Sequence, residues 1–76
     1  MTLDQLPPDT GGVVTALDSR GPERRRLMDL GLLPGAEVRV DMTSPLGDPT
    51  AYVVRGTLVA LRRSQARAVH VRAPEA

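Results

Sequence analysis

Leu27 to Val40, LMDLGLLPGAEVRV, is the stretch of this chain that decides its fold. It predicts, in order, the end of a helix, a short hydrophobic loop, a Pro-Gly turn and the start of a strand. Each of these steps has a local physical cause, and the remaining elements can be placed around them.

The helix is expected over residues 22–30. Pro22 can open it because the first helical turn has no use for a backbone N–H donor, and Glu23 lies near the positive end of the helix dipole. Leu27 and Leu30 fall three residues apart and share one face, which we expect to be directed toward the core. Gly31 then follows as a left-handed C-cap, the conformation that glycine adopts most easily.

The turn and the strand follow directly. Pro34 fixes φ at the first central position of a turn, and Gly35 accepts a positive φ at the second. Over residues 36–43 apolar and polar side chains alternate, which predicts a half-buried strand with one wet face. The expected inward set is Ala36, Val38, Val40 and Met42.

Further strands are expected at residues 12–17, 52–54, 57–62 and 68–72. In the first of them Val13, Thr15 and Leu17 share a face, and in the last Val69 and Val71 point inward. Residues 44–50 are predicted to form a loop, residues 64–67 a short 3₁₀-type turn, and the tail from residue 73 to be frayed. A mainly β chain with one short helix and five short strands favours a small five-stranded barrel, which removes exposed sheet edges. Periodicity alone leaves SH3-like and OB-like barrels both open.

The length of 76 residues predicts a single domain over residues 1–76. The chain has no cysteine, which excludes disulfides, thiolate zinc sites and iron–sulfur sites. The N-terminus shows no apolar signal-peptide core and no transmembrane run is visible, so we expect a cytoplasmic protein without membrane insertion.

The charge pattern is nearly balanced, with a net charge of +1. Such a balance gives no strong field toward nucleic acid or anionic lipid. Tyr52 is the only aromatic residue, so the chain lacks the stacking platform that modules for single-stranded nucleic acids or proline-rich peptides use. We therefore expect no direct nucleic-acid partner.

Arg24, Arg25 and Arg26 form the densest charge cluster, yet consecutive helical residues point about 100° apart and cannot build one patch. Asp29 lies at the spacing for ion pairs with Arg25 and Arg26. The cluster therefore fits either a docking patch for an acidic partner or a solvated helix face.

Catalytic and metal-binding patterns are not recognisable. His70, the only histidine, alternates with inward valines and should point outward, with no spacing motif that joins it to carboxylates. Gly11-Gly12 precedes a strand and not a helix, so it does not build an anion site. We expect no enzyme activity, no cofactor and no metal site.

Met28, Leu32 and Leu33 are apolar residues at or beyond the end of the helix. Met28 points away from the Leu27–Leu30 face, and the loop is too short to bury both leucines easily. Leu32 fits exposure or a plug for the barrel equally, whereas exposure is favoured for Leu33. Exposed apolar residues beside a rigid barrel indicate a contact surface.

Residues in and around the Leu27–Val40 stretch match a known family pattern. The pattern Arg-x-Leu-x-x-Leu-Gly-Leu-x-Pro-Gly-x-x-Val-x-Val is matched by Arg25, Leu27, Leu30, Gly31, Leu32, Pro34, Gly35, Val38 and Val40. Flanking matches are Leu3, Leu6, Pro45, Gly47, Asp48, Pro49, Gly56, Leu58, Ala60, Leu61, Arg62, Ala66, Val69 and Val71. In this order and spacing the chain resembles the FeoA family, small bacterial proteins associated with ferrous iron transport. Asp9 departs from the pattern at a place where glycine often follows the Leu-x-Pro opening.

This resemblance implies an SH3-like barrel and a partner, the membrane transporter FeoB with its cytosolic GTP-binding domain. The implied function is a non-catalytic cytosolic accessory protein that docks on that domain and adjusts nucleotide turnover or transport. The expected partner-binding residues are Arg25, Arg26, Met28, Leu30, Leu32 and Leu33. An alternative is an SH3-like interaction domain that assists a metal-dependent transcriptional regulator, and a third is self-association through the apolar loop.

Overall fold

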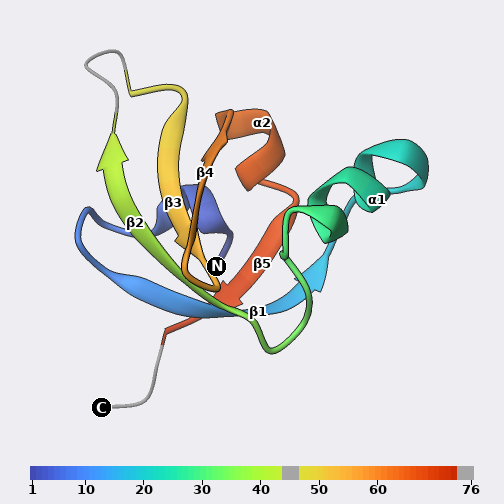
Figure 1. Cartoon of the computed structure of the whole chain (residues 1–76), viewed down its shortest axis with the longest axis horizontal. Helices are drawn as coiled ribbons and strands as arrows, with labels where there is room; N and C mark the ends of the chain where they lie inside the picture. Colours follow the sequence, from blue (N-terminus) through green and yellow to red (C-terminus); the bar gives the residue numbers. More distant parts are fainter. Residues whose placement is uncertain (44–46, 74–76) are drawn as a thin grey trace.

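The computed structural model describes residues 1–43 and 47–73, which form five antiparallel strands and two short α-helices (Figure 1). The elements, in chain order, are η1 (Leu3–Gln5), β1 (Gly11–Leu17), α1 (Gly21–Asp29), β2 (Glu37–Thr43), β3 (Thr50–Val54), β4 (Thr57–Leu61), α2 (Arg63–Ala66) and β5 (Val69–Arg72). Among these residues no helix is both long and apolar enough to cross a membrane.

The strands form one sheet in the order β4-β3-β2-β1-β5, and every neighbouring pair is antiparallel. The mainly β prediction is therefore confirmed, but the predicted closed barrel is wrong, because β4 and β5 end the ladder without pairing with each other. The N-terminal segment gives the reason: Thr2 bridges to His70, and the Val71 N–H donates to the Met1 carbonyl at 2.9 Å. The edge of β5 is thus occupied by the start of the chain.

The core lies on the concave side of this sheet. Alternation in β2 buries Val38 and Val40 and exposes Glu37 and Arg39, as the sequence predicts. Ala36 is also buried, the Met42 side chain lies outside the described part, and Val69 and Val71 of β5 point inward as expected. The core cluster is Leu3, Leu6, Val14, Leu27, Leu32, Ala36, Val38, Val40, Tyr52, Val54, Val59, Leu61, Ala66, Val69 and Val71.

The predicted shared face of β1 is wrong. Gly12 and Val14 are the buried residues, and a register shift against β5 between Val14 and Ala16 inserts one extra residue. The bulge breaks the period of two, so Leu17 lies against the core while Val13 faces outward beside Glu37.

Two smaller differences concern the helices. α1 begins at Gly21, one residue before the predicted start, and ends at Asp29. Residues 63–66 form a single α-helical turn where a 3₁₀-type turn is predicted. The predicted loop at residues 44–50 lies partly, and the tail beyond residue 73 entirely, outside the described residues.

Candidate docking surface at the end of helix α1

The helix ends in a complete Schellman motif centred on Gly31. Leu30 is the C-cap and Gly31 follows with φ of 98°. The Gly31 N–H donates to the Met28 carbonyl at 2.9 Å, and the Leu32 N–H donates to the Leu27 carbonyl at 3.1 Å. These bonds satisfy carbonyls that the helix end would otherwise leave free. The predicted left-handed C-cap at Gly31 is confirmed.

The Schellman motif explains why the Leu32 side chain is buried. A Schellman cap brings the residue after the glycine against the last buried turn of the helix, and here Leu27 and Leu32 are both 0% exposed. Leu32 therefore has no surface to offer a partner, and the prediction that it binds one is corrected: its side chain is part of the core.

Leu33 is half-buried and held by its own main chain. Its N–H donates to the Gly31 carbonyl and its carbonyl accepts from the Ala36 N–H, both at 2.9 Å. Gly35 has φ of 91°, as the second central residue of the predicted turn requires, and its N–H donates to the Val14 carbonyl at 2.7 Å. The loop is therefore fixed to β1 and holds Leu33 in one place.

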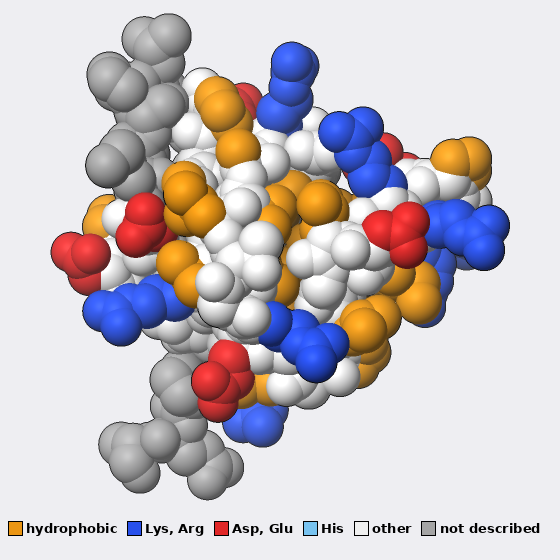
Figure 2. Space-filling model, viewed as in Figure 1, with side chains coloured by type: hydrophobic (Ala, Val, Ile, Leu, Met, Phe, Trp, Pro, Cys, Tyr) orange, Lys and Arg blue, Asp and Glu red, His pale blue; other side chains and the backbone are white. Residues whose placement is uncertain are grey.

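Arg25 and Met28 lie on one exposed face of α1, three residues apart. Met28 is 38% exposed, and both side chains line a shallow hollow with Pro22 and Asp29. Arg26 is exposed but does not line this hollow, and Leu30 is half-buried against the core. Figure 2 shows positively charged side chains gathered over α1. We call Arg25, Arg26, Met28, Leu30 and Leu33 the helix-end surface.

The structure does not bring these residues into a single cavity. Leu33 lines a separate hollow with Pro34, Glu37 and Arg55. Arg55 comes from the turn between β3 and β4, and no local pattern in the sequence indicates that this turn approaches the loop after α1. Its side chain lies beside Gly31, where an added Cβ would come within 3.7 Å of the Arg55 Cδ.

The ion pairs differ from those expected. Within the described part of the chain they join Arg67 to Asp4 at 3.8 Å and His70 to Asp18 at 3.7 Å, so the predicted pairs of Asp29 with Arg25 and Arg26 are not formed. The helix arginines remain available for an external carboxylate. The Arg24 Nη1 instead donates to the Leu17 carbonyl at 3.3 Å.

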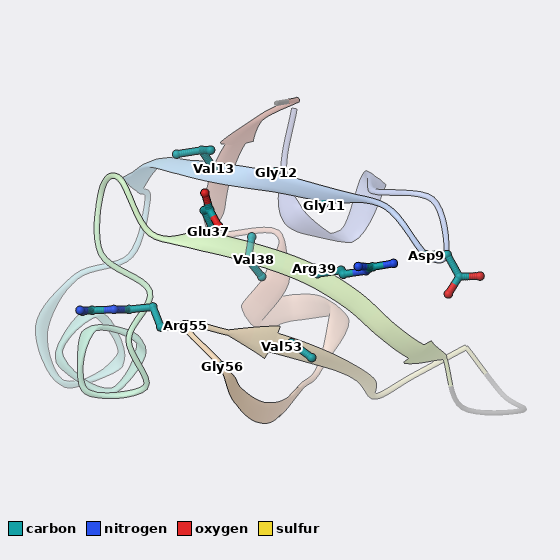
Figure 3. A pocket seen from close by; sticks show the side chains of 10 residues that line it. All are labelled: Asp9, Gly11, Gly12, Val13, Glu37, Val38, Arg39, Val53, Arg55 and Gly56. Atoms are coloured by element: carbon teal, nitrogen blue, oxygen red, sulfur yellow. The ribbon is translucent and has the colours of Figure 1, made fainter. Parts of the chain in front are cut away.

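A further hollow lies on the outer face of β1, β2 and β3 (Figure 3). Its lining includes Gly11 and Gly12, and Arg39 and Asp9 lie toward one end while Arg55 extends from the other. The charges are mixed and well separated in the view, and the hollow offers no arrangement for acid–base or nucleophilic chemistry.

The titratable and metal-ligating side chains of the described residues do not gather into a metal site. Burial raises the pKa of the Tyr52 phenol above its ordinary value of 10.0, although a hydrogen bond with Thr50 opposes the shift. Among residues 1–43 and 47–73 no group of three or more His, Cys, Asp or Glu side chains is placed to hold a metal ion. The absence of a metal site from the isolated chain stays a prediction.

Together, the open five-stranded sheet and the capped helix beside it define a small, mainly β domain. The model of the FeoA domain matches residues 1–73, and the chain therefore belongs to the FeoA family, which is linked to ferrous iron transport. The predicted family is confirmed.

Relatives agree with this assignment. A Fe(2+) transport protein A/Fe(2+) transporter FeoB fusion protein of Porphyromonas gingivalis is 31% identical over 71 residues. The match covers 93% of this chain but 8% of the fusion protein, so the chain spans a small part of that relative's length.

Solved structures support the fold. The FeoA protein from Chlorobium tepidum is 38% identical, with a TM-score of 0.89 over 96% of this chain and 70% of that chain. The zinc complex of FeoA from Stenotrophomonas maltophilia, described as a procaryotic SH3 domain protein, is also 38% identical, with a TM-score of 0.84 over 95% of this chain and 89% of that one. The SH3-like description therefore suits the arrangement of the five strands.

Proposed function

We propose that this chain is a non-catalytic cytoplasmic accessory protein of ferrous iron uptake, which docks on the cytosolic GTP-binding domain of an FeoB-type transporter. The observation that carries the proposal is the Porphyromonas gingivalis fusion protein, whose name joins a transport protein A to a transporter FeoB in one polypeptide. Fusion raises the effective concentration of two modules that act together.

The helix-end surface supports the docking step. Met28 supplies exposed apolar area, Leu33 is held in a fixed direction, and Arg25 supplies a charge with no ion pair in the described chain. A pre-organised apolar contact loses little entropy when a partner covers it. The arginines orient the encounter with an acidic surface and the apolar side chains hold it.

Regulation requires more than docking. A bound accessory protein shifts the transporter between two states only if it binds one of them more tightly than the other. We propose that the nucleotide-dependent conformation of the GTP-binding domain is the state that the helix-end surface distinguishes.

The test is binding of the purified chain to the isolated GTP-binding domain of its own organism's transporter, loaded with GDP or with a non-hydrolysable GTP analogue. We expect a different Kd for the two nucleotide states. Arg25→Glu should weaken binding about tenfold. Arg72→Glu makes the same charge change at the exposed end of β5 and should leave the Kd nearly unchanged.

Two outcomes contradict the proposal. Equal weakening by Arg25→Glu and Arg72→Glu would show nonspecific charge attraction in place of a docking surface. Binding that is absent in both nucleotide states, with a folded chain, would remove the transporter domain as the partner. The hypothesis that the chain assists a metal-dependent transcriptional regulator would then be the one to test, with that regulator as the probe.

A further inference from the structure

The two edge strands of the sheet, β5 and β4, differ in whether another segment of the chain covers them. At β5 the N-terminal segment covers the edge, with Thr2 bridging to His70 and the Met1 carbonyl accepting from the Val71 N–H. At β4 the other edge has no such cover: β4 pairs with β3 alone, and no described segment adds a strand to its far side.

The turn between β3 and β4 shows which main-chain groups lie on that free edge. Val54 and Thr57 are paired across a two-residue turn in which Arg55 has φ of 51° and Gly56 has φ of 84°. Two positive φ values define a type I′ hairpin turn. The residues that flank such a turn exchange hydrogen bonds, so Thr57 directs its N–H and C=O toward β3.

Alternation along β4 assigns the remaining groups. In an antiparallel pair, hydrogen-bonded and non-hydrogen-bonded positions alternate, so Val59 and Leu61 bond to β3 as Thr57 does. Leu58 and Ala60 then direct their N–H and C=O groups away from β3, and neither takes part in any other backbone hydrogen bond within the described chain. We call these outward groups of Leu58 and Ala60 the β4 edge.

The side chains beside the β4 edge are apolar. Leu58 is 63% exposed and lies directly across from Val53, and Ala60 is exposed and lies across from Ala51. Figure 2 shows hydrophobic side chains on this face over β3 and β4. Natural proteins usually protect an edge strand with a charge, a proline or a bulge, and TLVAL, the sequence of β4, contains no charge and no proline.

The charge at the two ends of β4 is mainly positive. Residues 50–73 contain five arginines and no acidic residue, and the Asp48 carboxylate lies at one end of β4, where it accepts from the Arg63 N–H at 2.9 Å. Arg55 and Arg62, at the two ends of β4, are exposed and form no ion pair with a described residue. The edge therefore complements an extended segment that carries carboxylates near both ends.

We propose that the β4 edge binds an extended segment of a partner protein by strand addition, and that this segment is apolar in its middle and acidic at its ends. Main-chain hydrogen bonds to Leu58 and Ala60 would supply the pairing, and the apolar face beside them would receive alternate side chains. The proposal concerns β4 and does not depend on the helix-end surface.

A second copy of this chain fits the β4 edge less well. The symmetric antiparallel register that uses both Leu58 and Ala60 places Val59 opposite itself, which brings the Arg55 turn of one copy toward the Arg62 end of β4 in the other. Like charges brought close together repel each other, and each copy would bring the same excess of arginine. The charge therefore favours an acidic partner over self-association.

Amide hydrogen exchange on the isotope-labelled chain tests the proposal directly. The probe is a synthetic peptide of alternating valine and threonine with glutamate and aspartate at both ends, and the control peptide carries lysine at those ends. Without peptide, the amides of Leu58 and Ala60 should exchange fast, while those of Val59 and Leu61 are protected. The acidic peptide should slow exchange at Leu58 and Ala60 by about tenfold or more and leave Val59 and Leu61 unchanged.

A matched pair of variants isolates the edge hydrogen bond. Ala60→Pro removes an N–H that faces away from β3, so the β3 ladder is kept and a fold is expected. It should weaken peptide binding about tenfold, whereas Ala60→Ser should change it little. If Ala60→Pro does not fold, N-methylation of the peptide amides that face β4 tests the same bonds on the parent chain and should weaken binding equally.

Three results would overturn the proposal. One is unchanged exchange at Leu58 and Ala60 with saturating acidic peptide. Another is equal binding of the lysine peptide, which would remove the charge argument. The third is protection of the two amides that grows with protein concentration in the absence of peptide, which would identify a second copy as the occupant.

Discussion

Gly31→Ala is the substitution for which the structure gives the clearest expected cost. Gly31 has φ of 98°, and an added Cβ would lie 3.3 Å from the Val54 Cγ1, a buried side chain with little freedom to move. A left-handed backbone costs an L-residue about 1–2 kcal/mol. The tight contact with Val54 adds to this, so we expect a loss of about 2 kcal/mol or more in the free energy of unfolding.

Gly35→Ala is the matched control. Gly35 has φ of 91°, similar to that of Gly31, but an added Cβ there meets nothing within 4 Å. It should carry the backbone cost alone, about 1 kcal/mol. The difference between the two variants therefore measures the contact of a Cβ at position 31 with Val54.

Thermal and urea unfolding followed by circular dichroism provide the assay. In a domain of this size each kcal/mol lowers Tm by about 4–8 °C, so Gly31→Ala should lose about twice as much Tm as Gly35→Ala. A Gly31→Ala variant as stable as the parent, or less damaging than Gly35→Ala, would refute the Schellman cap as the cause. Gly31→Asn should fall between alanine and the parent, because asparagine tolerates left-handed backbone better.

The remaining predictions concern burial, metal and pH. Leu32→Asp and Val40→Asp should leave the chain unfolded because each buries an unpaired charge, while Leu33→Asp should fold and lose affinity for the transporter domain; melts and binding isotherms of the three variants decide this. The isolated chain should bind Fe²⁺ weakly at best, and calorimetry that finds a stoichiometric micromolar site abolished by His70→Ala would contradict it. The raised pKa of Tyr52 means that the unfolded state loses the phenol proton first, so stability should fall as pH rises above 10, and this slope should disappear in Tyr52→Phe.

The local turns could be predicted from sequence because each depends on a backbone angle that few residues accept. Gly31 and Gly35 both have the positive φ that their positions predict. Apolar patterning alone does not decide the burial of Leu32, but the glycine cap does: in a Schellman cap the residue after the glycine packs against the last helical turn. Recognising the full motif, and not the glycine alone, would have placed Leu32 in the core.

The long-range features could not be predicted in this way. The bulge in β1 has no composition signal, and it moves Leu17 to the face opposite Val13. The closure of the barrel depended on whether β5 had a free edge, and the segment that covers it, at Met1 and Thr2, lies about seventy residues away in sequence. In the same way, the approach of Arg55 to the loop after α1 is set by the packing of the hairpin and not by any local pattern.

The C-cap also explains why the helix-end surface can act as a rigid unit. Gly31 turns the chain so that Leu32 enters the core, and this anchors the loop on one side while the bond from the Gly35 N–H to the Val14 carbonyl anchors it on the other. Between these anchors both main-chain groups of Leu33 are hydrogen-bonded. A partner that covers Leu33 therefore has little loop motion to arrest, and binding should depend on the contacts made and not on ordering the loop. A loss of partner binding in Gly31→Ala that exceeds its loss of stability would show that the cap positions this surface as well as ending the helix.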